Sequence, residues 1–403
     1  MKRIMMLGAG SLQLNAIRRI KEMGHQVVAS DYLESSPGKK LSDYAVMADT
    51  FSYEETLEGA KKYDIDAIMT TGTDQPVLTA ALVSEALGLK SSLSSEQALW
   101  VTNKKLMKEI FIKHDIPTVE QVFLKKDFID IPFDPPYVMK PLDSQGQRGI
   151  YKVRSKKEVR DLIGQTLSYS RQDEILLEKF YENQEVTVSG WVRDGMVYVL
   201  TITDRVTFSS DEHIGVCLSH EYPTIHQAYL DDLESLTRKI CKAFEIENGP
   251  IYFQFLIGQE GIMANEIACR IGGAYEDMTI PFVTGFDILK HQIDQVLGIR
   301  HPVKVERNNQ VFSTQLFFCK PGKISDIKID ALKQEDYIMD IGVNYKIGDV
   351  ISTTQNASQR AGYMVITGPD EERLTENISK AYDLLEILDE ERNLVIRGKR
   401  FYR

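Results

Sequence analysis

PPYVMKPLDSQGQRGIYKV, residues 135–153, combines two apolar runs with a glycine-rich loop between them. Its apolar run ends at Lys140, a loop containing Gly146 and Gly149 follows, and a second alternating run closes the segment. A strand, a glycine-rich loop and another strand in this order predict an antiparallel hairpin. The backbone N–H groups of such a loop can surround phosphate oxygens while a nearby lysine neutralises their charge. The segment therefore predicts a phosphate-binding hairpin, with an ordinary turn beside a solvated lysine as the alternative.

The sequence on either side of this hairpin follows two different patterns. Before about residue 113, short apolar runs such as RIMMLG and HQVVASD alternate with helical segments, which predicts a parallel, doubly wound sheet. After about residue 117 hairpins dominate, and the Asp194-Gly195 turn joins EVTVSGWV to MVYVLTITD. From near Asn308 strands mix with one helix near residues 370–388. We therefore expect an α/β and α+β multidomain protein.

Length, charge and cysteine content narrow the class of protein. The chain has 403 residues, which predicts roughly two to four domains. It carries 48 Lys and Arg against 59 Asp and Glu, a net charge of -11, and such an acidic chain is a poor match for nucleic acid. The four cysteines lack zinc-ligand spacing, and no apolar stretch approaches the roughly 20 residues that span a membrane. Because Gly8 interrupts the first apolar run, we expect no signal peptide and a cytoplasmic location.

MLGAGSLQL, residues 6–14, carries part of a dinucleotide-binding fingerprint. Gly8 and Gly10 match the first two glycines of G-x-G-x-x-G, and Asp31 ends the second strand where an acid would bind a ribose. Gln13 occupies the third position, where its side chain would hold helix and strand apart. We therefore interpret the stretch as a tight turn that begins the first crossover helix and is suited to touching a small substrate. Nicotinamide or flavin binding is the weaker alternative.

A second hairpin, PIYFQFLIG with GIMANEIACRI, carries an acidic residue on an apolar strand. A three-residue loop that ends at a left-handed Gly261 pairs Gly258 with Ile262 and places Gln254 opposite Glu266. A two-residue turn pairs Gln254 with Asn265 instead. Strict alternation predicts that one face carries Ile262, Ala264, Glu266, Ala268 and Arg270.

Two side-chain oxygens that face each other near phosphates suit Mg²⁺. This ion prefers a few carboxylate or carbonyl ligands, completed by phosphate and water. The sequence therefore predicts a metal site at Gln254 and Glu266, and the alternative is an ion pair between Glu266 and Arg270 that lines a groove.

Together these motifs resemble those of the ATP-grasp superfamily of carboxylate–amine ligases. Asn103-Lys104-Lys105 opens a helix, and Lys140, the glycine-rich loop, Gln254 and Glu266 follow in the superfamily's order. The resemblance covers essentially the whole chain, and its layout is similar to carboxyaminoimidazole ribonucleotide synthetases, biotin carboxylases and bacterial L-amino-acid ligases. It implies a doubly wound domain at residues 1–115, an ATP-grasp domain at 116–304 with lobes at about 116–183 and 184–304, and a C-terminal α+β domain at 305–403.

The resemblance also implies a role for each matching residue. Lys104 and Lys140 would bind phosphates, and the loop from Ser144 through Gln145 and Gly146 to Gly149 would form a lid over them. Glu178 and the backbone of Lys179 and Phe180 would hold the adenine, and Glu185 the ribose. Gln254 and Glu266 would hold Mg²⁺, with Mn²⁺ as the alternative ion. Arg270 would steady an acyl phosphate or the substrate carboxylate.

The implied reaction is ATP-dependent activation of a carboxylate as an acyl phosphate, followed by attack of an amine. Two residues depart from the superfamily's pattern. Gln254 replaces an acid, which lowers the charge of the metal site, and Ala268 replaces an asparagine, which leaves a second magnesium to depend on Glu266 and phosphate alone. A carboxylating enzyme that uses bicarbonate, of the biotin-carboxylase or ribonucleotide type, and a non-catalytic nucleotide-binding protein are the alternative functions.

Residues that contact the substrates are harder to assign. Asp74 follows a strand end and is a candidate for holding an amino group, with a helix N-cap before Pro76 as the alternative. Further candidates are Arg205, His213, Tyr275 and Glu276. We expect small-molecule carboxylate and amine substrates, no nucleic-acid or membrane partner, and a homodimer.

Overall fold

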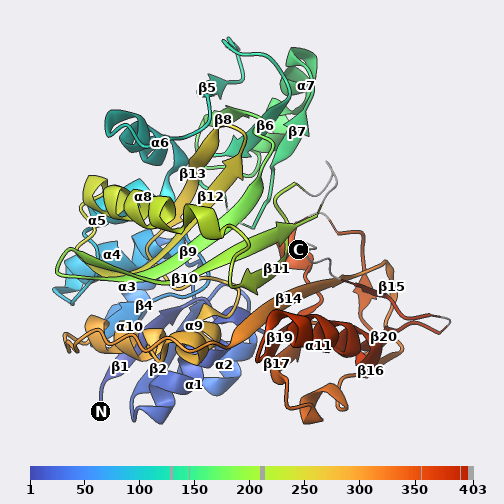
Figure 1. Ribbon diagram of the computed structural model, residues 1–403. Helices are drawn as coiled ribbons and strands as arrows, with labels where there is room; N and C mark the ends of the chain where they lie inside the picture. Colours follow the sequence, from blue (N-terminus) through green and yellow to red (C-terminus); the bar gives the residue numbers. More distant parts are fainter. Residues whose placement is uncertain (128–129, 145, 209–213, 355, 391, 398–403) are drawn as a thin grey trace.

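The N-terminal region is the parallel sheet that the alternating pattern predicts. The computed structural model describes residues 1–127, 130–144, 146–208, 214–354, 356–390 and 392–397. The first sheet has strand order β3-β2-β1-β4, with helices connecting its parallel strands (Figure 1). Its elements are β1 (Arg3–Leu7), η1 (Ser11–Gln13), α1 (Leu14–Glu22), β2 (Gln26–Asp31), α2 (Pro37–Leu41), β3 (Tyr44–Met47), α3 (Tyr53–Lys62) and β4 (Ala67–Met69).

The turn at residues 8–13 is filled by the side chain of Gln13. This side chain is buried, accepts a hydrogen bond from the Gly10 N–H at 3.1 Å and donates one to the Thr71 carbonyl at 2.7 Å. Asp31 is also engaged, because its carboxylate accepts the Ala9 N–H at 2.9 Å. The space and the acid that a dinucleotide would need are thus used by the protein itself, which supports the interpretation as a tight turn.

Three helices lead from this sheet into the next domain: α4 (Pro76–Leu87), α5 (Ser95–Thr102) and α6 (Lys104–Lys113). Asn103 caps α6, because its side chain accepts hydrogen bonds from the Lys105 and Leu106 N–H groups at 2.9 and 3.3 Å. The cap fixes Lys104 as the first residue of the helix.

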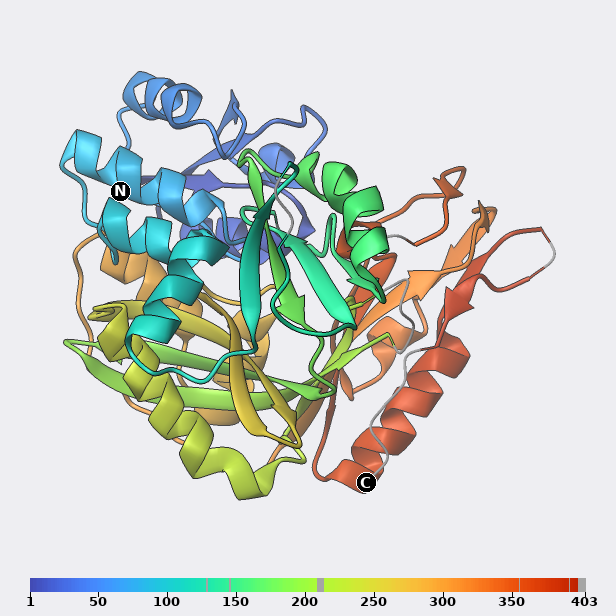
Figure 2. The ribbon, with the colours of Figure 1, turned by 90° about the horizontal axis from the view of Figure 1, so that it is seen from above.

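The small lobe is an antiparallel sheet with strand order β5-β8-β6-β7 (Figure 2). The hairpin predicted from residues 135–153 is confirmed: Tyr137 pairs with Val153 and Met139 with Tyr151. Helix α7 buries Val159 and Ile163 against the sheet. The elements are β5 (Gln121–Lys125), β6 (Tyr137–Pro141), β7 (Tyr151–Val153), α7 (Lys156–Leu167) and β8 (Glu174–Lys179).

A long sheet with strand order β13-β12-β9-β10-β11-β14-β19-β17 crosses the middle of the molecule (Figure 1). One face packs on α5, α6 and α8, where the rings of Phe111 and Phe244 meet edge to face at 5.7 Å. The other face packs Trp191 against α9 and α10 and against apolar residues of the N-terminal sheet. The large-lobe elements are β9 (Gln184–Arg193), β10 (Met196–Thr207), β11 (Cys217–Tyr222), η3 (Gln227–Tyr229), α8 (Leu230–Ala243), β12 (Asn248–Gly258), β13 (Gly261–Ala268), α9 (Glu276–Thr284) and α10 (Ile288–Val296).

The C-terminal region continues this sheet, because β14 pairs with β11 on one side and with β19 on the other. Helix α11 covers one face of this part, which has its own apolar core. No helix of the described residues is long and apolar enough to cross a membrane. The remaining elements are β14 (Val311–Cys319), β15 (Gly322–Lys323), β16 (Asp326–Lys328), η4 (Leu332–Gln334), β17 (Ile338–Val343), β18 (Val350–Ile351), η5 (Ala357–Gln359), β19 (Gly362–Gly368), α11 (Glu371–Leu384), β20 (Glu386–Leu388) and β21 (Val395–Ile396).

Candidate active site

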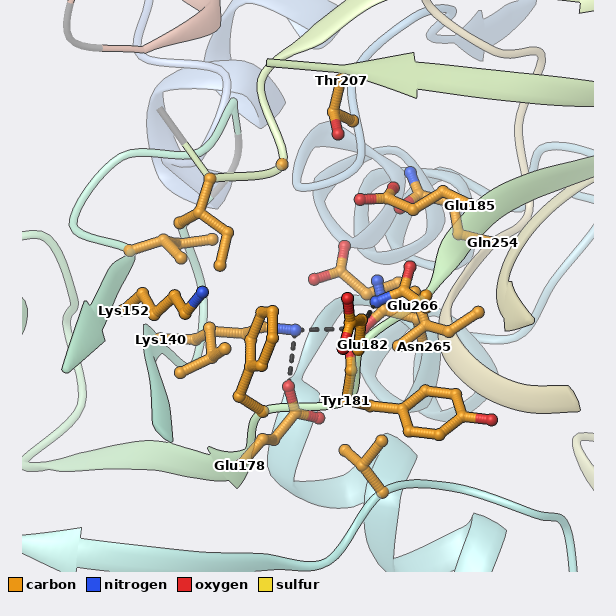
Figure 3. Close-up of a pocket in the computed structure, with 18 of the residues that line it drawn as sticks. Lys140, Lys152, Glu178, Tyr181, Glu182, Glu185, Thr207, Gln254, Asn265 and Glu266 are labelled. Atoms are coloured by element: carbon orange, nitrogen blue, oxygen red, sulfur yellow. Dashed lines mark hydrogen bonds and ion pairs between the residues drawn. The ribbon is translucent and has the colours of Figure 1, made fainter. Parts of the chain in front are cut away.

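The small lobe and the central sheet enclose a cavity of about 420 Å³. Strands β6 and β8 contribute Lys140 and Glu178 to its lining, and β9, β12 and β13 contribute Glu185, Gln254 and Glu266 (Figure 3). The fold thus brings together side chains from both lobes that the sequence separates widely.

Glu178 lies between two lysines at the floor of this cavity. Its Oε2 is 2.6 Å from Lys140 Nζ, and its Oε1 is 2.8 Å from Lys108 Nζ. Burial alone would raise the pKa of Glu178, but the two lysines outweigh it and lower the pKa to about 2. Burial likewise opposes the charge of Lys140, yet Glu178 and Glu266 outweigh it and raise the pKa of this lysine. Both groups are therefore charged at neutral pH.

Lys108 was not predicted from the sequence. It lies on the buried face of α6, and burial, its largest influence, lowers its pKa although Glu178 opposes this. Its Nζ also donates to the Thr118 hydroxyl at 2.8 Å. The sequence pattern that could have identified Lys108 is its helical spacing from Lys104, Met107 and Phe111, which places this lysine on the buried face of the helix.

The pairing of Gln254 with Glu266 is confirmed, but by a different route from the one predicted. Gly258 pairs with Gly261, so the turn has two residues rather than three. A β-bulge then shifts the register, because Phe255 pairs with Ala264 while Gln254 pairs with Glu266.

The bulge makes the prediction of strict alternation along β13 wrong. Ala264, before the bulge, and Ile267, after it, both belong to the core beneath the sheet. The unpaired Asn265 accepts a hydrogen bond from Lys140 Nζ at 3.0 Å, and Glu266 lines the same cavity (Figure 3). Two consecutive residues therefore face the site, which a regular strand cannot provide.

Lys104 connects the glycine-rich loop to the acidic residue on β13. Its Nζ donates to the Ser144 carbonyl at 3.2 Å and is 3.4 Å from Glu266 Oε1. The left-handed Gly149 is enclosed, since a Cβ there would lie 2.7 Å from Tyr169. Gln145, a predicted nucleotide contact, lies outside the described residues.

Residues 178–185 line one edge of the cavity. Glu185, the predicted ribose ligand, forms an ion pair with Arg205, which also donates to the Gly215 carbonyl at 2.8 Å. The N–H groups of Lys179 and Phe180 donate to backbone carbonyls at 2.8 Å each. These two N–H groups are thus occupied in the protein itself, which leaves the carbonyl oxygens of this backbone for the predicted pairing with a base.

A second cavity of about 300 Å³ adjoins the first and shares Arg205, Gln254 and Glu266 with it. Asp74 and Arg270 meet in this cavity, where Asp74 Oδ1 lies 2.8 Å from Arg270 Nε and 2.6 Å from Nη2. The guanidinium of Arg270 lies 4.4 Å from the centre of the Tyr252 ring. Asp74 does not cap α4, whose N-cap residue is Gln75, so the capping alternative for Asp74 is wrong.

Tyr275 and Glu276 do not line either of these cavities. The Tyr275 ring stacks on Tyr363 at 3.6 Å and lines a separate hollow. Glu276 turns back to accept the Ala274 N–H at 2.7 Å. Tyr275 has a left-handed backbone, which directs the chain away from the cavity at this point. His213 lies outside the described residues.

Two residues of the second cavity, His220 and Arg360, were not predicted. Burial and the nearby Arg205, Arg360 and Arg270 hold the pKa of His220 well below its usual range, so the ring is neutral at pH 7. Its Nδ1 lies 3.1 Å from the Thr203 hydroxyl. Only the position of His220 within the strand CLSHEY, residues 217–222, could have indicated it as an inward-facing polar residue. Nothing near Arg360 in the sequence indicates a site.

The donor set at Gln254 and Glu266 fits a magnesium ion that takes its other ligands from phosphate and water. Among the described residues no group of three or more His, Cys, Asp or Glu side chains is placed to hold a metal. A metal here would therefore depend on the bound nucleotide for part of its coordination.

Two regions of the chain match known families. Residues 133–277 match the ATP-grasp domain, and residues 315–388 match the L-amino acid ligase C-terminal domain 2. The human mitochondrial carbamoyl-phosphate synthase [ammonia] is 26% identical over 152 residues, which span 38% of this chain and 10% of that protein. Formate-dependent phosphoribosylglycinamide formyltransferase of Bacteroides fragilis is 23% identical over 67% of this chain and 71% of its own.

Solved structures agree with the fold along the whole chain. The L-amino acid ligase from Bacillus licheniformis superposes with a TM-score of 0.83 and 16% identity, covering 97% of this chain and 99% of that one. The biotin carboxylase domain of the Hydrogenobacter thermophilus 2-oxoglutarate carboxylase, solved with MgADP, ADP and bicarbonate, superposes with a TM-score of 0.78 and 20% identity. It covers 96% of this chain and 90% of that one.

Residues 133–277 are an ATP-grasp domain, and the fold, the two-lobed cavity and this domain match support ATP-dependent carboxylate–amine ligation. Enzymes of the ATP-grasp superfamily use ATP and Mg²⁺. The C-terminal match, over residues 315–388, is to a domain of L-amino acid ligases.

Proposed function

We propose that this protein is an ATP- and Mg²⁺-dependent ligase that joins the carboxylate of one amino acid to the amino group of another. The observation that carries the proposal is the contact between two cavities at Gln254 and Glu266. The first cavity has Lys140 and Glu185, as expected for a nucleotide, and the second has Lys104, most of the lid and arginines suited to carboxylates. The C-terminal match to L-amino acid ligases favours amino acids over bicarbonate.

ATP is proposed to occupy the cavity beneath the lid. Lys140 and Lys104 would neutralise its phosphates, Glu185 would hold the ribose, and the strand that carries Glu178 would border the base. The lid from Ser144 to Gly149 would exclude water from the reacting groups. In the free protein Lys140 is engaged by Glu178 and Asn265, which holds its ammonium group beside the phosphate path before ATP arrives.

Gln254 and Glu266 are proposed to hold Mg²⁺, with Mn²⁺ as the alternative ion. When bound, the ion would neutralise charge on the phosphates during transfer. The neutral amide of Gln254 lowers the charge of the site by one compared with two carboxylates.

The proposed reaction has two balanced steps. A carboxylate oxygen of the first substrate attacks the γ-phosphorus of ATP, the bond to the β,γ-bridging oxygen breaks, and an acyl phosphate and ADP form. The amine nitrogen of the second substrate then attacks the acyl carbon, inorganic phosphate leaves, and the former ammonium group has released two protons. Arg270, held by Asp74, would orient the acyl phosphate.

The proposed function is tested by incubating the protein with ATP, Mg²⁺, hydroxylamine and each of the twenty L-amino acids in turn. Hydroxylamine traps an acyl phosphate as a hydroxamate, so ADP and hydroxamate should form in equal amounts with at least one acid. Turnover with bicarbonate alone would favour a carboxylating enzyme. ATP binding without turnover on any acid would favour a non-catalytic protein and overturn the proposal.

We also propose a homodimer in a reducing, cytoplasmic compartment. All four cysteines are buried free thiols, which supports the compartment. Light scattering during size-exclusion chromatography tests the dimer, and a mass of one chain would refute it.

A further inference from the structure

Arg360 reaches the second cavity from the C-terminal domain. It follows the short helix η5 and lines this cavity, but not the nucleotide cavity. Its Nε is buried without a hydrogen-bond partner, and its guanidinium forms no ion pair with the described residues. Arg205 is near enough to repel it. Arg360 is partly buried, and a guanidinium whose Nε is shielded from water gains most from a ligand that supplies an anion.

The other arginines that line the second cavity differ from Arg360. Arg270 is paired with Asp74, and Arg205 is paired with Glu185. Arg148 lies on the lid and is exposed to solvent. Arg360 is therefore the one of these four arginines that is partly buried and has no counter-ion among the described residues.

The backbone around Arg360 is held in place before any ligand binds. The Asn344 side chain donates to the Arg360 carbonyl at 2.9 Å, and the Ala361 N–H donates to the Phe317 carbonyl at 2.9 Å. On the other side, the Ala357 N–H donates to the Gly146 carbonyl of the lid at 3.1 Å. The guanidinium is thus presented by a fixed loop that spans from the C-terminal sheet to the lid.

We infer that Arg360 binds the carboxylate of the amine-donating substrate and so determines which amines the enzyme accepts. This inference rests on the proposed ligase function. The carboxylate of the first substrate must reach the phosphates near Lys140 and Glu266, which line the nucleotide cavity, and it loses its carboxylate charge when the acyl phosphate forms. The carboxylate of the second substrate does not react and keeps its charge throughout. Arg360, which does not line the nucleotide cavity, matches that second group.

The test separates the two substrates by using two amines with the same first acid. The first acid is any amino acid that yields hydroxamate with the wild-type enzyme. Hydroxylamine carries no carboxylate, whereas L-alanine does, and L-alaninamide serves as a neutral comparison of similar shape. The variants are Arg360→Met, Arg360→Lys and, as a control, Arg373→Met, which removes an exposed arginine of α11.

For the wild type, we expect the KM for L-alanine to be at least about tenfold lower than that for L-alaninamide. Arg360→Met should raise the KM for L-alanine by about 10- to 100-fold and remove the preference over L-alaninamide. It should leave hydroxamate formation and the KM for ATP unchanged. Arg360→Lys should restore part of the preference, and Arg373→Met should match the wild type.

Three results would overturn the inference. One is an Arg360→Met enzyme that keeps its preference for L-alanine. Another is an equal loss of hydroxamate and peptide formation in a variant with unchanged thermal stability, because that would assign Arg360 to the first substrate. The third is a wild type that prefers L-alaninamide. A wild type that makes no hydroxamate with any acid would instead refute the proposed ligase function itself.

Discussion

Replacing Glu178 by glutamine removes the negative charge between Lys108 and Lys140 while keeping the size of the side chain. Both lysines are buried, so the variant leaves two ammonium groups close together without their shared counter-ion. Because an uncompensated buried charge is strongly unfavourable, we expect Glu178→Gln to be less stable than the wild type.

The size of the effect follows from the pKa of Glu178, which the lysines lower from 4.5 to about 2. This difference corresponds to about 3 kcal/mol in favour of the folded state at neutral pH. The side chain is 3% exposed, so water screens the interaction little. Since the pKa is lower in the folded than in the unfolded state, the contribution is complete above about pH 4.5 and disappears as the pH falls towards 2.

The assay is urea unfolding followed by circular dichroism at pH 7 and pH 3.5. We expect Glu178→Gln to lose about 3 kcal/mol of unfolding free energy at pH 7, and the gap to the wild type to narrow by about 1 kcal/mol at pH 3.5. The control is Glu120→Gln, which breaks an exposed ion pair with Lys179 in the same lobe and should cost less than about 0.5 kcal/mol. A Glu178→Gln variant as stable as the control, or a gap that is equal at both pH values, would refute the reasoning.

Three other substitutions give distinct outcomes. Glu266→Gln should reduce hydroxamate formation by at least about 100-fold while the protein stays folded, because it removes the charged metal ligand. Glu260→Gln in the exposed turn should keep the wild-type rate, and equal rates for the two variants would contradict the metal assignment. Gln13→Ala should cost about 2 kcal/mol in urea unfolding, because a buried amide loses both of its hydrogen bonds, and an unchanged stability would contradict its structural role. Burial raises the pKa of Asp277 from 3.8 to about 6 in the folded protein. The folded state therefore loses stability relative to the unfolded state as the pH rises from about 4 through 6. Asp277→Asn should thus raise the free energy of unfolding by about 1 kcal/mol or more at pH 8 but leave it unchanged at pH 4. Equal melting-temperature changes at the two pH values would exclude that explanation.

The sequence by itself determined the local features of this protein. The hairpin at residues 135–153 and the helix start at Asn103 depend on neighbours in the chain, namely glycine conformations, alternation and side-chain capping. The parallel order of the first sheet follows from strands separated by helices. These features are readable because the interactions that create them lie within a few residues of one another.

The tertiary structure alone decided where distant side chains meet. The bulge at Asn265 keeps Gln254 opposite Glu266 despite a shorter turn, and strict alternation cannot anticipate such an inserted residue. Lys108 meets Glu178 because α6 packs against the strands of both lobes, and Arg360 reaches the second cavity because β14 pairs with β11. Such contacts depend on how whole elements pack, and for that reason neither Lys108, which pairs with Glu178, nor His220 and Arg360 of the second cavity could be predicted.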